Sequence, residues 1–261
     1  MKNIIKTVVM SAVVALAMTS CSDTDPAGLT RITYYPVFTL EGGSIYSVPV
    51  GSSYADPGYK AVEGTEDVTA KVVTTITDID GNPVDAITTT EPTFFTVTYS
   101  AVNVDGFEAS AQRTVFVYDP SVTVSMEGTY STDMANSMYM YKGTPTPFAT
   151  MTKSYGYTDQ CTGLEFTELA PGIYEVNDLM GGWYEQIRGF GANYGAGMGS
   201  MTGYVSLDGD NKISLMSSYI EAWGDGLDWI KNGVYDPATG VMSYDLSYAG
   251  SVNMTVVLNK D

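Results

Sequence analysis

Histidine is absent from all 261 residues, and this absence excludes more chemistry than any other feature of the sequence. Without histidine the chain cannot form the Ser-His-Asp or Cys-His arrangements of nucleophilic catalysis. The ligand sets that usually hold zinc and non-haem iron also depend on it. We therefore expect no catalytic residues, no metal site and no cofactor.

Cysteine occurs only twice, and the first occurrence is Cys21. Before it come Lys2 and Lys6, then an apolar run over residues 7–18 and a short segment of small residues. That order is typical of a bacterial signal peptide, and the run is about half as long as a membrane-spanning helix requires. A cysteine at the first mature position is the lipid acceptor of bacterial lipoproteins. We predict a signal peptide over residues 1–20 and lipid attachment at Cys21; the alternative is a secretory peptide with an incidental cysteine.

The second cysteine, Cys161, has no partner for an intramolecular disulfide once Cys21 carries lipid. No histidine is present to activate its thiol, so we predict that Cys161 is buried and unreactive. The domains must then be held together by their hydrophobic cores.

Basic residues are scarce: 12 lysines and arginines stand against 30 aspartates and glutamates, a net charge of −18. Removal of the signal peptide takes away Lys2 and Lys6 and no acid, which leaves 10 basic residues and a charge of −20. Such a field repels phosphate backbones and anionic head groups. It argues against nucleic acid as a partner and does not disfavour neutral ligands such as sugars.

Residues 21–31 begin with a short, polar and acidic segment, as expected for a solvated tether. Two fatty chains on Cys21 would hold the protein on its membrane, which one chain alone would not do. The acidic residues after the cysteine, Asp23 and Asp25, resemble the surface-export signals of Bacteroidota lipoproteins. The resemblance implies the outer membrane with the protein facing the cell exterior; the periplasmic side is the alternative.

Tryptophan is missing from residues 32–118, which are rich in threonine and valine, whereas all three tryptophans lie further along the chain. The change occurs near Asp119-Pro120-Ser121, a short polar junction where a proline interrupts strand pairing. We therefore predict two domains, at residues 32–119 and 120–261.

The first domain contains two β-branched and aromatic runs, at residues 94–102 and 111–118, on either side of Asp105-Gly106. Asp-Gly between such runs predicts a hairpin with a type I′ turn. Further strands are predicted at 32–40, 45–50, 68–76 and 84–88. About seven short strands without an amphipathic helix predict an immunoglobulin-like β-sandwich.

A turn motif, Asp56-Pro57-Gly58, lies between Gly51-Ser52 and Tyr59 in this domain. Pro57 presets φ for the second turn position, and Gly58 tolerates the positive φ of the third. With Asp67-Val68-Thr69 and the strands at 96–99 and 113–117, the motif resembles bacterial immunoglobulin-like domains described as hyalin-repeat-like. That resemblance implies a spacer or adhesion module.

The second domain is also predicted to be built of strands, at residues 129–141, 172–177, 201–207, 212–217, 241–248 and 251–258. Turn-forming segments at 207–212 and 236–240 separate them and predict an antiparallel barrel or sandwich. The last two strands resemble the terminal hairpin of Bacteroidota surface lipoprotein domains encoded with glycan importers. The resemblance implies a role in polysaccharide uptake, with an oligosaccharide or polysaccharide and an outer-membrane glycan transporter complex as partners.

Aromatic residues gather in the Gly-rich part of the second domain, beside carboxylates. A pyranose presents an apolar C–H face to an aromatic ring while nearby acids satisfy its hydroxyl groups. We therefore predict a carbohydrate-binding platform at Trp183, Tyr184, Tyr194, Trp223, Asp225, Asp228 and Trp229. The alternative is that these rings fill the β core, where large aromatic residues supply much of the apolar content.

Two acidic segments, Asp78-Ile79-Asp80-Gly81-Asn82 and Asp208-Gly209-Asp210-Asn211, lack a closing bidentate glutamate and are predicted to be turns rather than calcium sites. Among 30 acids some pair at glycosidase spacing arises by chance, and the sequence identifies none. Our main hypothesis is a non-catalytic glycan-binding accessory lipoprotein. A structural or adhesion protein is the alternative, and a histidine-free hydrolase would require a cleft with two facing acids and a raised pKa.

Replacing Cys21 with serine removes the predicted lipid acceptor, so we expect the Cys21→Ser protein to leave the membrane. Detergent-phase partitioning measures this, with the native protein expected in detergent and the variant in water. A native protein found in the aqueous phase, or a serine variant that stays with the membrane, would contradict the assignment.

Overall fold

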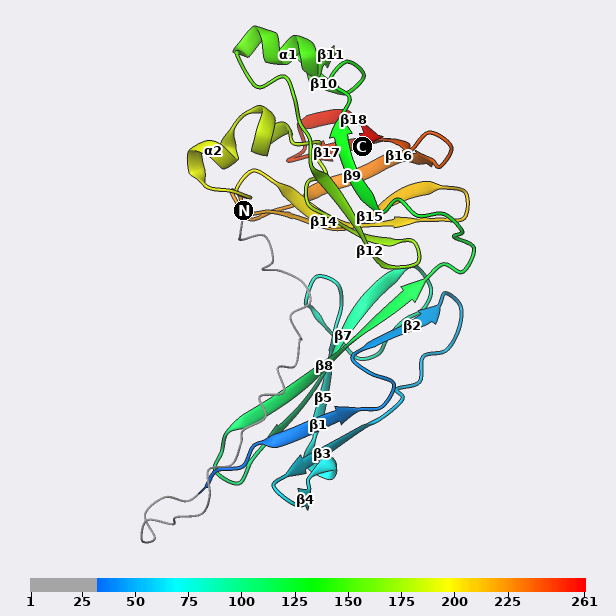
Figure 1. Cartoon of the computed structure of the whole chain (residues 1–261), viewed down its shortest axis with the longest axis vertical. Coiled ribbons are helices and arrows are strands. Elements are labelled where there is room, and N and C mark those ends of the chain that lie inside the picture. The colour runs from blue at the N-terminus through cyan, green and yellow to red at the C-terminus, as the bar shows by residue number, and fades with distance from the viewer. Residues whose placement is uncertain (1–31) are drawn as a thin grey trace. The chain divides into compact units, whose positions relative to one another are not determined.

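The computed structural model describes residues 32–261, so the predictions for the signal peptide, the tether and Cys21 lie outside the described residues. The described chain is all-β, which confirms the predicted fold class. An immunoglobulin-like domain is followed by a closed antiparallel barrel of eight strands (Figure 1). Within residues 32–261, no helix combines the length and the apolar character needed to cross a membrane.

The immunoglobulin-like domain is built from two sheets, ordered β1-β3-β4 and β2-β8-β7-β5-β6. Its strand β2 runs parallel to β8, whereas β1 and β3 are antiparallel. The elements are β1 (Pro36–Leu40), β2 (Ile45–Pro49), β3 (Tyr59–Glu63), β4 (Glu66–Asp67), η1 (Thr69–Lys71), β5 (Val73–Thr77), β6 (Pro83–Val84), β7 (Thr93–Val102) and β8 (Glu108–Tyr118).

Several local predictions for this domain need correction. Strands β3 and β4 were not predicted, and a short 3-10 turn, η1, precedes β5 where one continuous strand was expected at 68–76. The β7–β8 hairpin is present, but its turn is not type I′, because Gly106 has positive φ and Asp105 does not. The side chain of Asn103 caps this turn instead, since its Oδ1 accepts the N–H groups of Asp105 at 3.0 Å and Phe107 at 2.7 Å.

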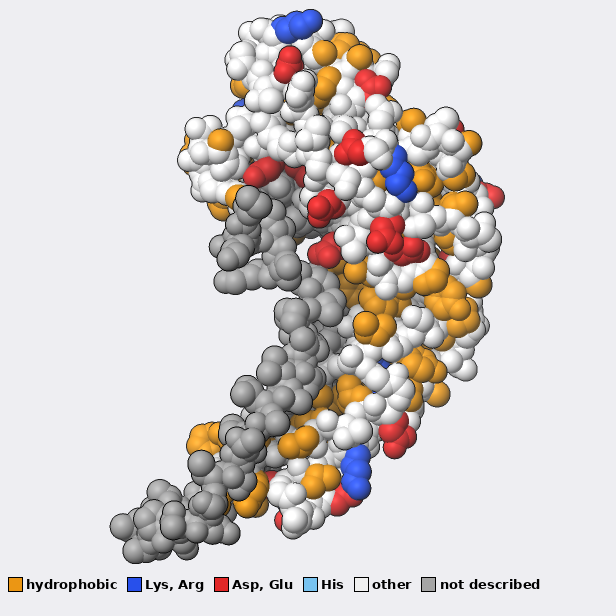
Figure 2. Space-filling view, viewed as in Figure 1, with side chains coloured by type: hydrophobic (Ala, Val, Ile, Leu, Met, Phe, Trp, Pro, Cys, Tyr) orange, Lys and Arg blue, Asp and Glu red, His pale blue; other side chains and the backbone are white. Residues whose placement is uncertain are grey.

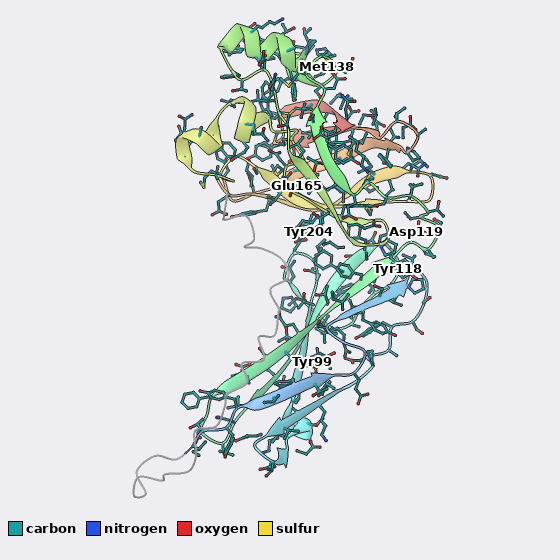
Figure 3. The ribbon with its side chains drawn as sticks, viewed as in Figure 1. Tyr99, Tyr118, Asp119, Met138, Glu165 and Tyr204 are labelled. Atoms are coloured by element: carbon teal, nitrogen blue, oxygen red, sulfur yellow. The ribbon has the colours of Figure 1, made fainter. Side chains whose placement is uncertain are left out.

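A fully buried arginine, Arg113 on β8, organises the interior of the immunoglobulin-like domain. Its guanidinium donates to the Asp56 carboxylate and to the Tyr99 hydroxyl, which in turn donates to Asp56 (Figure 3 labels Tyr99). It also donates to three backbone carbonyls, those of Glu41, Gly43 and Gly58. A buried charge needs a paired carboxylate and filled donors, and this arrangement provides both.

The Asp-Pro-Gly turn therefore does more than reverse the chain. Gly58 has a φ of 109°, as predicted, and its N–H donates to Asp56 Oδ1 at 2.8 Å. Burial alone would raise the pKa of Asp56, but the hydrogen bonds from Tyr99 and Gly58 and the charge of Arg113 outweigh it and lower the pKa. The turn thus holds an ionised carboxylate against the buried guanidinium.

The C-terminal half contains a ten-stranded sheet in which β18 also pairs with β9, so that β9 and β12 to β18 close into the barrel. The hairpin β10–β11 continues from β18 outside this ring. The elements are β9 (Gly128–Thr132), β10 (Met138–Tyr141), β11 (Thr144–Pro147), α1 (Phe148–Tyr155), β12 (Leu164–Ala170), β13 (Ile173–Val176), η2 (Trp183–Ile187), α2 (Phe190–Tyr194), β14 (Met201–Leu207), β15 (Lys212–Ile220), β16 (Leu227–Asp236), β17 (Val241–Tyr248) and β18 (Val252–Lys260).

Period-2 alternation places the core of the barrel. On β17 the side chains of Met242, Tyr244 and Leu246 are buried, and on β18 those of Met254, Val256 and Leu258 are buried. Successive side chains on a strand point to opposite faces, so the residues between them face outward. Cys161 is buried in the same core with a free thiol, as predicted, and burial raises its pKa to about 12.

The sequence did not predict strands β11, β12 and β16 or the two helices. Helix α1 begins at Phe148, directly after Pro147, and ends at Tyr155, and the next residue, Gly156, has a φ of 70°. A proline before a helix and a left-handed glycine after it are recognised boundary signals.

The described chain forms two compact units. The first contains residues 32–44, 56–75 and 97–113, and the second contains residues 45–55, 76–96 and 114–261. The predicted boundary near residue 119 stays a prediction.

Removing the partner of the buried guanidinium should destabilise the protein strongly. We expect Asp56→Ala to lower the free energy of unfolding by about 3 kcal/mol, because it leaves Arg113 charged and buried without its carboxylate. Urea unfolding followed by far-UV circular dichroism measures the loss. Asp85→Ala, which removes an exposed carboxylate of the same domain, is the control and should change stability by less than about 0.5 kcal/mol. Equal effects of the two substitutions would contradict this role.

Candidate functional site

The outer face of β16, β17 and β18 brings polar and aromatic side chains into two cross-strand rows. Directly paired residues on neighbouring strands point to the same face of a sheet. The first row contains Lys231, Asp245 and Thr255, and Met138 of β10 pairs with Thr255 at its end. The second row contains Trp229, Ser247 and Asn253.

A groove of about 390 Å³ lies over these rows, and its volume is within the range of small-molecule sites. The β10–β11 hairpin contributes apolar side chains, including Met138, which Figure 3 labels. The lining residues are Met138, Met140, Pro145, Trp229, Asp245, Leu246, Asn253, Met254 and Thr255. We call this the Trp229 groove.

Asp245 is held in a fixed orientation in the groove. The Thr255 hydroxyl donates to its Oδ1 at 2.6 Å, and the Asn232 amide donates to its Oδ2 at 2.7 Å. A carboxylate has about four acceptor positions, so each oxygen can still accept from a ligand. The carboxylate is therefore oriented before any ligand arrives.

Trp229 is half-buried and is positioned by irregularities in β16. The pairing of β16 with β17 shifts register on both sides of the segment from Trp229 to Lys231. Such bulges re-aim side chains and often occur beside functional sites. The Lys231 ammonium lies 4.5 Å from the centroid of the Trp229 ring, a cation–π contact that steadies both side chains.

Two of the predicted platform residues belong to the core. Trp183 is 2% exposed and its ring contacts those of Tyr139 and Phe148, with centroids 5.1 and 4.5 Å away. Tyr184 is 6% exposed. Their burial matches the alternative that the sequence left open, and neither side chain offers a face to a ligand.

Two other predicted residues form a separate exposed patch with Phe190. The Trp223 ring lies 5.3 Å from that of Phe190, and the Tyr194 ring lies 5.2 Å from it. Trp223 is 46% exposed and Tyr194 is 70% exposed. Asp225 accepts a hydrogen bond from the Tyr248 hydroxyl at 2.8 Å, which fixes the loop that carries Trp223.

The last predicted residue, Asp228, holds the turn between β17 and β18. Its Oδ2 accepts from Ser247 Oγ and from the Gly250 N–H, both at 2.8 Å. The predicted set is thus divided among the core, the patch, this turn and the Trp229 groove. The sequence missed Asp245 and Asn253, because only the register of β17 and β18 places them beside Trp229.

The acidic segments that were weighed as ion sites are turns. Asp78 Oδ1 accepts the N–H groups of Asp80 and Asn82, and Asp208 Oδ1 accepts those of Asp210 and Lys212. These carboxylates satisfy backbone donors, as Asx turns do. Within residues 32–261, no group of three acidic or cysteine side chains is arranged to hold a metal ion.

Two family models match the chain, one in each half. A family model described as "-like, C-terminal domain" matches residues 119–260, which is more than half of the chain. The protein belongs to this family. A model described as "Bacterial surface protein, Ig-like domain" matches residues 38–117, which is less than half of the chain.

No curated protein sequence matches the chain. Among solved structures, a crystal structure of a lipoprotein from Bacteroides thetaiotaomicron is similar to it, with 28% sequence identity. The match covers 87% of this chain and 100% of that chain, with a TM-score of 0.43.

Asp178 of the C-terminal domain has a strongly raised pKa, as the acid of a hydrolase would need, but it lies in the core. Burial raises the pKa of Asp178 to about 7, while the Met180 N–H, 2.9 Å from Oδ1, acts in the opposite direction. Asp178 is 3% exposed, and within the described residues its Oδ2 has no hydrogen-bond partner. The raised pKa therefore has a structural cause, and a substrate would not reach this group.

Asp178 should make stability depend on pH. The folded protein holds the proton up to a pH of about 7, whereas the ordinary pKa of an aspartate is 3.8, so stability falls as the pH rises between these values. Because the chain has no histidine, few other groups titrate between pH 5 and 8. We expect a lower Tm at pH 8 than at pH 5.

Asp178→Asn removes this titration and should flatten the difference in Tm. Glu165→Gln, which removes an exposed carboxyl group of the same domain, is the control and should leave the difference in Tm unchanged. Thermal unfolding at both pH values measures the effect. An unchanged pH dependence in Asp178→Asn would rule out Asp178 as its source.

Proposed function

We propose that this chain is a non-catalytic surface lipoprotein whose C-terminal domain binds a neutral glycan in the Trp229 groove. The observation that carries the proposal is the position of Trp229 beside Asp245, a carboxylate whose two oxygens are already oriented by Thr255 and Asn232. An aromatic ring and a fixed acceptor in one groove are the two elements that a sugar ring requires.

The apolar and polar parts of the groove match the two faces of a pyranose. Trp229, Met138 and Met140 supply apolar surface for the C–H face. Asp245 and Asn253 supply acceptors and donors for hydroxyl groups. Ionised acceptors form hydrogen bonds about twice as strong as neutral ones, so Asp245 should contribute most to orientation.

The charge of the protein restricts the kind of glycan. With a net charge of −18 before processing, the chain repels anionic ligands. Asp245 would also repel a carboxylate or sulfate placed in the groove. A neutral oligosaccharide or polysaccharide is therefore the ligand that we propose.

The proposed location is the outer membrane, with the protein anchored by lipid on Cys21 and facing the cell exterior. The match of residues 38–117 to a domain of bacterial surface proteins supports this location. The acidic tether and the similarity of the last hairpin to glycan-importer lipoproteins support a role as an accessory of a polysaccharide transporter.

A structural or adhesion role is the second candidate. The burial of Trp183 and Tyr184 favours it, because a protein without a ligand would place its large rings in the core. The immunoglobulin-like domain is also compatible with a spacer.

Substitutions in the groove should weaken glycan binding by the full-length protein. We expect Trp229→Ala and Asp245→Asn each to reduce affinity at least about tenfold, which corresponds to roughly 1.4 kcal/mol of binding free energy. Affinity gel electrophoresis in a panel of neutral polysaccharides measures the change.

Trp223→Ala is the matched control, because it removes an exposed tryptophan of the same domain outside the groove. It should leave affinity unchanged. If Trp223→Ala abolishes binding and Trp229→Ala does not, the glycan binds at the exposed patch. If no polysaccharide retards the native protein, the structural role is the better account.

A further inference from the structure

Exposed apolar side chains gather at the end of the immunoglobulin-like domain where the described chain begins. The exposed fractions are 68% for Ile32, 54% for Tyr34, 50% for Tyr35, 61% for Val104 and 51% for Phe107. We call these five residues the apolar end. In Figure 1 the start of β1 and the β7–β8 turn lie side by side, and Figure 2 shows apolar side chains in the same part of the view.

The apolar end is held together by specific contacts. The side chain of Asn103, which is 5% exposed, caps the β7–β8 turn and donates from Nδ2 to the Tyr34 carbonyl at 2.7 Å. The Tyr35 and Phe107 rings lie 5.9 Å apart between centroids. The turn and the first residues of the fold are therefore fixed to each other as one surface.

The side chains of the apolar end are exposed although the turn that carries two of them is ordered by hydrogen bonds. A turn between two strands is ordinarily polar. Apolar side chains that stay in water do not contribute the free energy that their burial would provide. Apolar groups that gather on a surface mark sites of contact with a protein or a membrane. The proposed partner is inferred from Cys21, the predicted lipid acceptor that precedes Ile32 in the chain.

Cys21 lies 11 residues before Ile32, so the fully extended chain between them spans at most about 40 Å. A lipid on Cys21 would keep the membrane surface within this reach at all times. Tethering converts a weak contact into an intramolecular one with a high effective concentration. Tyrosine suits such a surface, because its ring is apolar and its hydroxyl remains in contact with water.

We propose that Ile32, Tyr34, Tyr35, Val104 and Phe107 rest on the lipid surface in which Cys21 is anchored. This inference rests on the lipid anchor of the proposed function and is independent of the glycan site. Asp105 lies within the turn and Glu108 directly after it, and both acids would be repelled by anionic head groups. The contact is therefore made by apolar insertion into neutral lipid rather than by charge.

A fluorescent label at position 107 tests the proposal in the full-length lipidated protein. Phe107→Cys introduces an accessible thiol, whereas lipid blocks Cys21, and burial with a raised pKa protects Cys161. The labelled protein is bound to phosphatidylcholine vesicles with and without spin-labelled lipid. We expect the emission at position 107 to shift to the blue and to be quenched by the spin-labelled lipid.

Val234→Cys, at an exposed valine of the C-terminal domain, is the matched control and should show neither change. Val104→Cys repeats the test should Phe107→Cys fold poorly. If the label at position 107 keeps the emission of a water-exposed fluorophore when the protein is bound to vesicles, the proposal is wrong. A blue shift without quenching, together with a dimer in sedimentation, would assign the surface to a second copy instead.

Mass spectrometry of the N-terminal peptide separates this proposal from the one on which it rests. An unmodified Cys21 overturns both the anchor and the membrane contact. A lipidated Cys21 with an unquenched label overturns only the contact and leaves the glycan proposal unaffected.

Discussion

The pairing of β18 with β9 is the constraint on which the C-terminal domain depends. Leu258 lies opposite Thr132 and Lys260 opposite Tyr130, and these pairs close the barrel. Closure leaves every side chain of the ring either inside or outside, and a slip of one residue would exchange the two sets. The positions of Trp229 and Asp245 on the outer face follow from this register.

In the immunoglobulin-like domain, a buried charge determines which segments pack against one another. Arg113 joins β8 to the Asp56 turn and to carbonyls of the chain around β1. Such an arrangement contributes little net stability compared with an apolar core, but few alternative packings satisfy all of its donors. The charge therefore defines which segments must meet in this domain.

The two halves of the chain offer different surfaces to their surroundings. The barrel carries a groove with an oriented carboxylate, and the immunoglobulin-like domain carries an apolar end close in sequence to the proposed lipid site. Both surfaces are fixed in place by side-chain hydrogen bonds, from Thr255 and Asn232 in one and from Asn103 in the other. Preorganised groups lose less conformational freedom on binding, which favours contact with a partner.

The sequence by itself determined the all-β class, the buried Cys161 and the positive φ of Gly58, because alternation, solvation and turn chemistry are local properties. It could not separate Trp183 from Trp229, since a buried ring and a half-buried ring have the same local signature. Only the tertiary structure decided that one fills the core and the other lines a groove. The physical reason is that strand register, which sets the neighbours of Asp245 and Asn253, depends on pairing between residues far apart in the chain.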